Sequence, residues 1–427
     1  MPPLDGAVLL DLGRMDGILA FDEDLACITV EPGVTFRQVH DFLRERGSGL
    51  FCAVIGGAAD ASLIGNALER GDGVGPLRQR AEHAAAMEVV LADGQRIETG
   101  LGRWPGAVAT PVHRAGLGPG LHGLLLQSSL GVVTRMSFWL TPRPAFLQVL
   151  TLDMADDGAL AGALDALRGL GQRGALGEAG FTFWNHIKFI ARQRPYPWAA
   201  SDPAAALRPE ALGVAPWQGS GAHYAASRAL GHATRELVLA ALQPWAKVAV
   251  FDTDTHGPEL ASSLFMGVPS DLNLTSTYWR KRGPMPSAGP DPDPDRDGCG
   301  VLFICPVLPL QGAPAVQALA QVEALIRRHG LEPNLGMHID AHRTLLAYIA
   351  LMYDREAPGE DARALACHDA VLALLVSLGH YPFRLALPAQ GQLPAPADDT
   401  VSVMAALKSA LDPAQVLSPG RYRFGPP

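Results

Sequence analysis

The sequence is poor in cysteine, and its cysteines are not spaced for a metal site or a redox pair. Among 427 residues the five cysteines are Cys27, Cys52, Cys299, Cys305 and Cys367. No two of them form a Cys-x-x-Cys pair. A sparse, odd set in a long chain excludes a disulfide-rich secreted domain and indicates reduced thiols, so we expect a cytoplasmic protein.

Long apolar runs and positive charge are also scarce. No apolar run reaches the roughly eighteen residues needed to cross a bilayer. The first residues, MPPLDGAVLLDLG, lack the basic start and apolar core of a secretion signal. The formal net charge of -9 argues against a broad surface for nucleic acid or anionic lipid. We therefore expect neither nucleic acid nor a membrane as a partner.

Motifs for common sites are absent or incomplete. There is no GxSxG elbow and no P-loop. Gly118–Gly123 fits the pattern GxGxxG, but it contains proline and follows no strand signal, so we interpret it as a turn. His338 and His342 are four residues apart and would share one face of a helix, yet no third ligand accompanies them. We predict no metal site.

What is present predicts two domains of the α+β class. A chain of 427 residues is too long for one simple core. Its 48% hydrophobic and 18% charged residues are typical of a globular protein. Strand and helix signals are mixed without regular β-α-β alternation, which favours α+β over a doubly wound parallel sheet.

Local patterns predict the elements of the N-terminal third. Ala7–Leu12 and Cys27–Glu31 are short apolar segments that we interpret as strands. Thr35 and Gln38 have the spacing of a capping box, which predicts a helix with Phe36, Val39 and Leu43 on its buried face and Gly47 after its end. Asp93-Gly94 between Met87–Leu91 and Gln95–Ile97 predicts a β-hairpin.

Further along the chain, helix signals alternate irregularly with strand signals. Glycines at 330 and 379 and proline at 413 follow apolar helical stripes. The predicted helices are 159–170, 363–378 and two helices marked by apolar stripes, one by Val316, Leu319, Val322, Leu325 and Ile326 and the other by Met404, Leu407 and Leu411. The segment 301–307 is predicted to be a buried strand, 345–353 is a further apolar run, and 201–216 and 283–298 are predicted to be irregular.

Two stretches are poor in large side chains. Val54–Arg70 reads VIGGAADASLIGNALER, and Gln127–Pro142 reads QSSLGVVTRMSFWLTP. Glycine and small residues leave backbone amides bare, so a flat or anionic ligand can approach the main chain closely. We expect these stretches to form the walls of a ligand groove around Gly65 and Gly131.

Five segments occur in one order along the chain: ITVEPGVTFRQVHDFL, SLIGNALERG, MEVVLADGQRIETG, SSLGVVTRMSFWLTPRP and LDPAQVLSPGRYR. Together they resemble the vanillyl-alcohol oxidase / 4-cresol dehydrogenase family of FAD-linked oxidases over nearly the whole chain. The resemblance implies a PCMH-type FAD-binding domain and a cap domain with an antiparallel sheet and flanking helices. It places flavin binding in residues 1–144, the cap and substrate domain in 145–379, and the return to the flavin domain in 380–427.

The resemblance also implies roles for single residues. It implies that Arg421 lies near the N1–C2=O edge of the flavin, where it would stabilise the anionic reduced form, and that Arg384 holds a phenolate. For each arginine the alternative is a surface ion pair. The residues that it places in contact with the flavin are Ser62, Ile64, Gly65, Asn66, Met87, Glu88, Val89, Gly131, Val132, Val133, Thr134 and Arg421.

Several positions depart from the family pattern. Met1 falls just after the place where the family's pyrophosphate loop ends, so the first subdomain is expected to be incomplete. Phe383 replaces a phenol-binding tyrosine, and Gln79 replaces an aspartate near flavin N5. Val301 stands where a histidine would bond to the flavin. We therefore expect FAD to be bound non-covalently and weakly, because charge-assisted contacts are lost.

Three functions remain open from the sequence. The first is an FAD-dependent oxidoreductase that takes a hydride from a benzylic-type carbon of an aromatic alcohol or para-substituted phenol, with oxygen or a cytochrome as electron acceptor. The second is a catalytically silent homologue that acts as a partner subunit or scaffold. The third is a flavin-free enzyme that reuses the cavity. The resemblance implies a homodimer or a heteromer.

Overall fold

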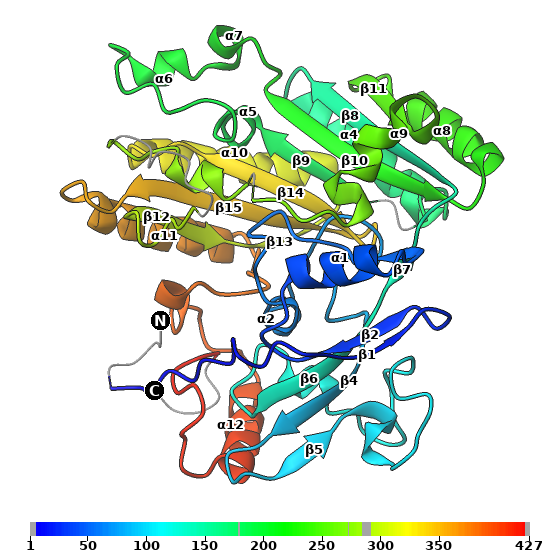
Figure 1. Ribbon diagram of the computed structural model, residues 1–427. Coiled ribbons are helices and arrows are strands. Elements are labelled where there is room, and N and C mark those ends of the chain that lie inside the picture. Colours follow the sequence, from blue (N-terminus) through cyan, green and yellow to red (C-terminus); the bar gives the residue numbers. More distant parts are fainter. Residues whose placement is uncertain (1–5, 178–179, 272, 284–291, 423–427) are drawn as a thin grey trace. The chain divides into compact units, whose positions relative to one another are not determined.

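The computed structural model describes residues 6–177, 180–271, 273–283 and 292–422. The chain forms two compact units (Figure 1). Unit 1 comprises Met1–Arg143, Ser263–Pro269 and Leu387–Pro427, and unit 2 comprises Pro144–Ser262 and Ser270–Ala386. Unit 2 is therefore inserted into the sequence of unit 1. Both units combine antiparallel sheets with helices, which confirms the predicted α+β class.

Unit 1 is built on a five-stranded antiparallel sheet. In sheet order the strands are β1 (Ile18–Asp22), β2 (Cys27–Val30), β6 (Val132–Trp139), β4 (Ala84–Val90) and β5 (Arg96–Glu98). A separate two-stranded ladder joins β3 (Leu50–Phe51) to β7 (Thr141–Pro142). The α-helices are α1 (Phe36–Glu45), α2 (Leu63–Leu68), α3 (His122–Leu125) and α12 (Thr400–Leu411), and 3-10 turns occupy Gly100–Arg103, Leu264–Met266 and Leu387–Ala389.

The capping box at the start of α1 is confirmed. The Thr35 side chain accepts a hydrogen bond from Gln38 N, and Gln38 Oε1 accepts one from Thr35 N. The predicted stripe of Phe36, Val39 and Leu43 is buried. The hairpin is confirmed as well: β4 pairs with β5, and Gly94 takes the left-handed φ of 86° in the turn.

The strand predicted at Ala7–Leu12 is wrong. This segment has no regular structure, and Val8, Leu9 and Leu10 are 95%, 77% and 64% exposed. The edge strand is β1 instead, which pairs with β2. An apolar run therefore did not identify the strand here, because it has no neighbouring strand or core to pack against in the described part of the chain.

Unit 2 is built on an eight-stranded antiparallel sheet. In order along the sheet the strands are β11 (Lys247–Asp252), β8 (Phe146–Met154), β10 (Trp217–Ala225), β9 (Phe181–Asn185), β14 (Asn334–Asp340), β15 (Thr344–Asp354) and β12 (Cys299–Ile304), with β13 (Val307–Pro309) also paired to β15. The predicted strand 301–307 is thus divided: β12 ends at Ile304, and the chain re-pairs with β15 at Val307.

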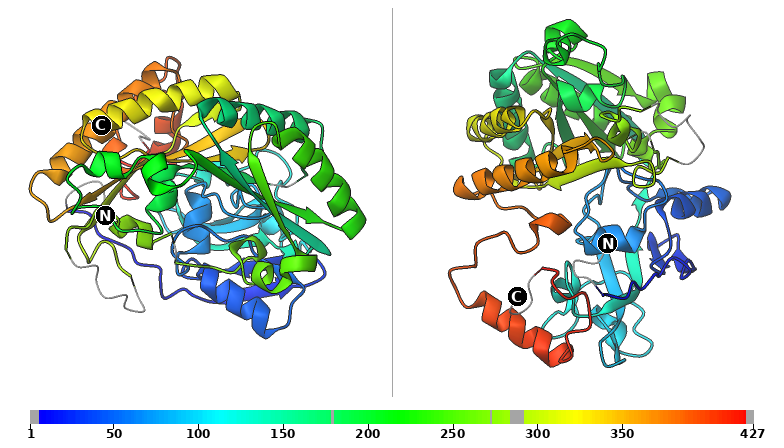
Figure 2. Two further views of the ribbon diagram at one scale, coloured as in Figure 1. Left: turned by 90° about the horizontal axis from the view of Figure 1, so that it is seen from above. Right: turned by 90° about the vertical axis from the view of Figure 1, so that its left-hand side faces the viewer.

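Four long helices cover one face of this sheet. They lie side by side in the order α11 (Glu360–Ser377), α10 (Gly312–Arg328), α4 (Asp157–Gln172) and α8 (Arg228–Leu242), as the left view of Figure 2 shows. The predicted glycine ends are confirmed, because Gly330 and Gly379 have φ of 70° and 81°. The shorter helices are α5 (His186–Ile190), α6 (Pro203–Ala206), α7 (Pro209–Leu212), α9 (Thr253–Ala261) and the 3-10 turn Thr275–Tyr278.

The structure bears in different ways on the remaining sequence predictions. The segment 201–216, predicted to be irregular, contains the single-turn helices α6 and α7. Part of the loop predicted at 283–298 lies outside the described residues. All five cysteines are buried and free of disulfides. No helix in the described ranges is both long and apolar enough to span a bilayer.

Candidate functional site

The predicted flavin segment Ser62–Asn66 lies in the first turn of α2. Ser62 caps this helix: its Oγ accepts from Gly65 N at 2.9 Å and donates to Pro32 O at 2.6 Å. Ile64 is buried in the core, whereas Gly65 is exposed. Asn66 Oδ1 accepts from Arg80 at 2.8 Å. Gly65 is therefore the position in this turn where a ligand can reach the main chain.

The loop before α2 presents bare backbone donors. Gly56 and Gly57 are only partly buried, and within the described residues their N–H groups donate no hydrogen bond. Buried Arg80 fixes the loop, since it donates to Ala53 O at 2.8 Å and its guanidinium carbon lies 4.6 Å from the centre of the Phe36 ring. Free N–H groups on partly buried glycines fit a flat, acceptor-rich group such as a flavin. Sequence reasoning missed Arg80.

Met87, Glu88 and Val89 lie in β4, and their side chains point to opposite faces of the sheet. Met87 and Val89 are buried in the core of unit 1. The Glu88 carboxylate lies on the other face, where it accepts from Thr134 Oγ1 at 2.8 Å and lies 3.4 Å from Arg135. This is the alternation expected along a strand.

Gly131–Thr134 lead into β6, the strand next to β4. Val133 and Val132 pair with Val89 and Val90. A Cβ added to Gly131 would overlap Cγ1 of Val89. Gly131 is thus required by packing between strands.

The structure brings the predicted flavin segments of unit 1 together. Gln127 N donates to Leu68 O at 2.8 Å, which ties the end of α2 to the chain before Gly131. Ile64, Met87 and Val133 belong to one hydrophobic core. The two stretches singled out in the sequence therefore lie in one packed unit.

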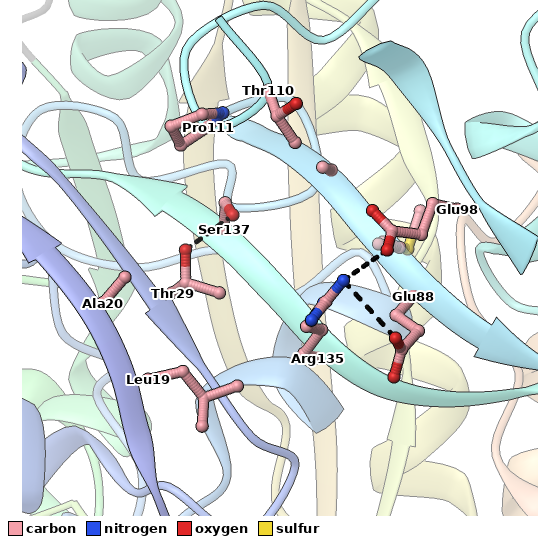
Figure 3. A pocket seen from close by; sticks show the side chains of 11 residues that line it. Leu19, Ala20, Thr29, Glu88, Glu98, Thr110, Pro111, Arg135 and Ser137 are labelled. Atoms are coloured by element: carbon pink, nitrogen blue, oxygen red, sulfur yellow. Dashed lines mark hydrogen bonds and ion pairs between the residues drawn. The ribbon is translucent and has the colours of Figure 1, made fainter. Parts of the chain in front are cut away.

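A cavity of about 320 Å³ opens on the outer face of the five-stranded sheet (Figure 3). Arg135 is placed between Glu88 and Glu98 and pairs with both carboxylates. Thr29 and Ser137 are joined by a hydrogen bond of 2.8 Å on the neighbouring strands. Each charged side chain that lines this cavity is paired with one of opposite sign. The cavity therefore offers no unpaired charge that would favour an ionic ligand.

Arg421 is paired with the end of α2. Its guanidinium forms an ion pair with Glu69, and Tyr422 Oη donates to the same carboxylate at 2.6 Å. Both partners of the ion pair are about one third exposed, at 32% and 33%. An ion pair was the alternative left open for Arg421 from the sequence, but no local pattern identified its partner, because Glu69 and Arg421 are 352 positions apart.

The C-terminal return is fixed by a buried ion pair that the sequence analysis missed. Lys408 Nζ lies 2.5 Å from Asp412 Oδ2 and donates to Ser129 O at 2.7 Å and Leu417 O at 2.9 Å. Burial alone would raise the pKa of Asp412. Hydrogen bonds from Lys408 and the N–H of Leu417 outweigh burial and hold this pKa below its ordinary value.

In unit 2, the sheet face opposite the four long helices carries an aromatic-cationic cluster. Trp184, Gly336 and Tyr348 are register partners across β9, β14 and β15. The ring centres of Tyr348 and Phe383 are 6.0 Å apart. The cluster consists of Trp184, Lys188, Arg192, Cys305, His338, Tyr348, Phe383 and Arg384.

Arg384 lies among the rings of this cluster. Its guanidinium carbon is 5.6 Å from the centre of the Tyr348 ring and 5.2 Å from that of Phe383. It is also hydrogen-bonded to the Cys305 thiol, whose pKa is raised by burial. A cation over aromatic faces is suited to hold an anionic aromatic ligand. Arg384 and Arg421 lie in different units, so each is considered with its own neighbours.

Two further cations of the cluster were not predicted. Lys188 Nζ donates to Asn334 Oδ1 at 3.0 Å, and Arg192 donates to Asn273 Oδ1 at 3.1 Å. The Arg192 guanidinium lies 4.5 Å from the centre of the Trp184 ring. Burial, with a smaller contribution from Arg192, lowers the pKa of Lys188 to about 8.

The helix assumed for His338 and His342 is absent. His338 lies in β14 and its ring centre is 5.1 Å from that of Tyr348. His342 lies in the following turn at φ of 54°, with Nε2 3.1 Å from Gly177 O. Among the described residues no group of three His, Cys, Asp or Glu side chains is arranged to hold a metal.

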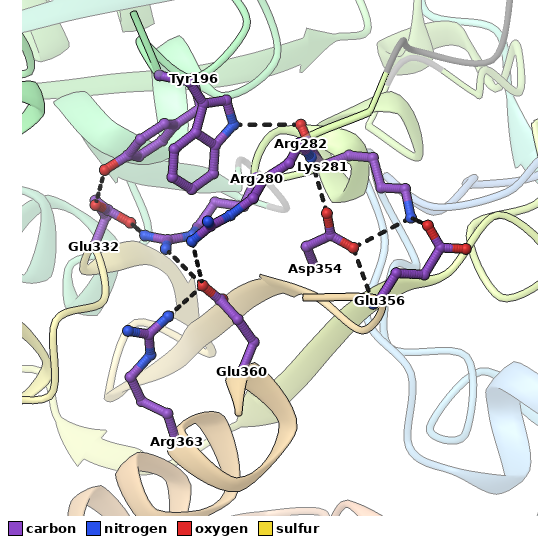
Figure 4. Close-up of polar contacts among 10 residues, drawn as sticks. Tyr196, Arg280, Lys281, Arg282, Glu332, Asp354, Glu356, Glu360 and Arg363 are labelled. Carbon is purple, nitrogen blue, oxygen red and sulfur yellow. Dashed lines mark hydrogen bonds and ion pairs between the residues drawn. The ribbon is translucent and has the colours of Figure 1, made fainter. Parts of the chain in front are cut away.

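A separate polar network of unit 2 is balanced in charge (Figure 4). Buried Arg280 pairs with Glu332 and lies 3.5 Å from Glu360. Lys281 lies 3.2 Å from Asp354 and 2.6 Å from Glu356. Because every cation here has a carboxylate, the network is suited to hold the chain together, and we do not place the site in it.

Comparison with known proteins gives consistent matches. A family model described as an FAD binding domain matches residues 2–100. Over 455 residues the chain is 38% identical to 1'-carboxy-chondrochloren decarboxylase of Chondromyces crocatus, covering 99% of this chain and 83% of that protein. Over 431 residues it is 26% identical to the 4-cresol dehydrogenase [hydroxylating] flavoprotein subunit of Pseudomonas putida, covering 98% and 79%.

Solved structures agree with these relatives. The fold is similar to that of p-cresol methylhydroxylase with substrate bound, with a TM-score of 0.87, 25% identity, and coverage of 98% of this chain and 80% of that chain. It also matches 4-ethylphenol oxidase from Gulosibacter chungangensis at a TM-score of 0.88 and 23% identity, covering 100% and 82%.

Proposed function

Since this chain belongs to the family of p-cresol methylhydroxylase-type (PCMH-type) FAD-linked oxidoreductases, we propose that it removes a hydride from a benzylic-type carbon of an aromatic substrate. The observation that carries the substrate class is Arg384, which lies over Tyr348 and beside Phe383. Rings of this kind pack against an aromatic ligand, and the guanidinium stabilises a phenolate.

The cofactor is FAD, which supplies a hydride acceptor when it is bound. We assign its binding to unit 1. The bare amides of Gly56 and Gly57 and the exposed Gly65 are suited to its polar edge. With FAD bound, Arg421 would supply positive charge beside it, and Glu69 would fix the orientation of Arg421 while offsetting part of that charge. In the sequence Val301 stands in place of the linking histidine, which favours non-covalent binding.

Unit 2 is assigned to substrate binding. Arg384 orients the substrate by its charged end, and the rings of Tyr348 and Phe383 exclude water from the reacting carbon.

Oxygen or a cytochrome is the proposed electron acceptor. Oxygen uptake in the absence of added dye, compared with reduction of cytochrome c, separates these two acceptors.

A second candidate function is oxidative decarboxylation. It is favoured by the 38% identity to a protein named as a decarboxylase. In such a reaction the oxidised carbon is next to one that carries a carboxylate. The bond to the carboxylate breaks, its electron pair forms a carbon–carbon double bond, and CO2 leaves.

The absorbance spectrum of the purified protein tests the proposal. We expect an FAD band at about 450 nm that bleaches when 4-ethylphenol is added without oxygen. A protein that is colourless and takes up no added FAD contradicts the cofactor assignment and favours a flavin-free or silent homologue. A yellow protein that is bleached by dithionite but by no aromatic alcohol, phenol or aromatic acid contradicts the substrate class.

A further inference from the structure

Lys188 is held against the sheet in a fixed direction. It lies in α5, and its side chain crosses the position where Gly336 of β14 has no Cβ. A Cβ at Gly336 would lie 2.8 Å from Lys188 Cε and 2.9 Å from Cδ. The absence of a side chain at Gly336 therefore provides the space that the methylene groups of Lys188 occupy. Gly336 is the register partner of Tyr348 on β15.

The ammonium group of Lys188 has no counter-charge within the described residues. Its only polar partner there is the neutral amide oxygen of Asn334, at 3.0 Å. Asn334 is itself buried and donates to Met352 Sδ at 3.6 Å. The nearby Arg192 likewise bonds to an amide oxygen, that of Asn273, and not to a carboxylate.

This arrangement differs from the other cations buried in unit 2. Arg280 and Lys281 each contact two carboxylates (Figure 4). Leaving a cation without a counter-charge in a partly desolvated place is unfavourable. Unlike Arg280 and Lys281, Lys188 is held in that situation, and it lies beside the aromatic rings of the cluster, where a charged ligand would relieve it.

We propose that the substrate is an aromatic acid and that Lys188 binds its carboxylate. The inference rests on the proposed function, which places an aromatic ring at Tyr348 and Phe383. Arg384 and Lys188 both act to lower the pKa of the Cys305 thiol, so both charges lie near that thiol within the cluster. A carboxylate that enters there obtains the charge-assisted hydrogen bonds that Asn334 alone does not provide.

Paired ligands and a matched control variant test this inference. The probes are 4-ethylphenol and 3-(4-hydroxyphenyl)propanoate, which share the ring and the benzylic carbon and differ in the carboxylate. Binding is measured by calorimetry on the FAD-loaded protein after its flavin has been reduced with dithionite under anaerobic conditions, so that neither ligand is oxidised and the readout does not depend on turnover. Lys188→Met is compared with Lys247→Met, which removes an exposed lysine from β11.

We expect Lys188→Met to weaken binding of the acid about 10- to 100-fold, since a hydrogen bond to a charged group is lost, and to leave binding of 4-ethylphenol within about 2-fold. Lys247→Met should change neither. Equal loss for both ligands, or no loss for the acid, overturns the inference. Inorganic phosphate that binds as tightly as the acid also overturns it, because it would show a general anion site.

The pH dependence provides a second readout. Lys188 must be protonated to bind the acid, so affinity should fall as pH rises through about 8. Arg192 and Cys305 are the charged or titratable groups that act on Lys188; the arginine stays charged, and burial raises the pKa of the thiol. Lys188→Met should abolish this dependence. If it persists, Lys188 is not its source.

The outcomes separate this inference from the proposed function. If wild-type protein binds and oxidises 4-ethylphenol but does not prefer the acid, the proposed function stands and the inference is wrong. If it binds FAD but neither ligand, the substrate class is wrong. Should Lys188→Met fail to fold, Lys188→Gln retains an N–H donor for Asn334 without the charge and gives the same test.

Discussion

Arg384 and Arg421 are the same residue type in different surroundings. Arg421 shares an ion pair with Glu69, whereas Arg384 lies over the rings of Tyr348 and Phe383 and bonds to a thiol. Arg421 also lies over a ring, that of Tyr422, at 5.5 Å, but the rings around Arg384 belong to the cluster assigned to the substrate. At the scale of the residue, Arg384 is therefore the more sensitive position for substrate recognition.

We expect Arg384→Ala to raise KM for 4-ethylphenol about 10-fold, because a charge-assisted contact to the phenolate is lost. FAD content should stay at the wild-type level, since the residues assigned to FAD lie in unit 1. Steady-state kinetics and the flavin absorbance of the same preparation measure both quantities. Arg327→Ala on α10, where Arg327 pairs with Glu323 at 2.6 Å, is the control. Unchanged KM in Arg384→Ala would contradict the role.

Residue-level features were only partly predictable. Arg384 and Arg421 were identified from short motifs, but the partner of Arg421 is 352 positions away and no local pattern indicates it. Lys188 stands in HIKFI, where a lysine on a short helix has the pattern of a solvated side chain. The pairing of β14 with β9, which brings Gly336 beside Trp184, reveals that its side chain lies against the face of the sheet at Gly336.

At the scale of elements, local signals worked where both the capping group and the buried stripe lay in one segment. The capping box of α1 is of this kind, and the Asp93-Gly94 hairpin is likewise specified within one short segment. The apolar run Ala7–Leu12 failed, since a strand also needs a partner, and β1 (ILAFD) was missed, as two of its apolar side chains face outward. Pairing decides between such segments, and it is not a local property.

The β4–β6 contact leads to a prediction. Gly131→Ala should destabilise the protein by about 1–3 kcal/mol, because the added methyl group overlaps Val89. Urea unfolding measures the change. Gly123→Ala is the matched control, since Gly123 lies in α3 with nothing within 4 Å of an added Cβ, so we expect no loss. In a Val89→Ala background the cost of Gly131→Ala should fall; an equal cost in both backgrounds contradicts the overlap.

At the scale of the whole molecule, length and mixed periodicity predicted two domains and the α+β class. They did not indicate that the short segment Ser263–Pro269 returns to unit 1 in the middle of unit 2. Gly267 has φ of 75°, and an added Cβ would lie 2.6 Å from Cys52 O. A close backbone contact of this kind depends on the assembled fold, and seven residues carry no compositional signal of it.

The return of the chain to unit 1 depends on Lys408. Lys408→Met should cost about 3–5 kcal/mol at pH 7, because it leaves the Asp412 carboxylate buried without its cation. The pKa of Asp412 is lower in the folded protein than its value of about 3.9 in the unfolded chain, so the ionised carboxylate stabilises the fold above about pH 3.9. This stabilisation is lost as pH falls through the pKa of Asp412 in the folded protein. The difference in free energy of unfolding between Lys408→Met and wild type, measured in urea, should therefore become smaller below about pH 4.

Lys247→Met is the control for this experiment as well, since its side chain is exposed. A difference between Lys408→Met and wild type that stays constant from pH 7 to pH 3 would contradict the assignment to the Asp412 carboxylate. A difference of less than about 1 kcal/mol at pH 7 would place the pair among ordinary surface ion pairs.

The bond from Lys408 to Ser129 also has a consequence for biosynthesis. Its two ends are 279 positions apart, with all of unit 2 between them. A ribosome that adds about 5–20 residues per second makes the carbonyl on the order of 15–60 s before the lysine that covers it. During that interval the core of unit 1 in the nascent chain is incomplete, and a chaperone could bind the surface that the C-terminal segment later covers.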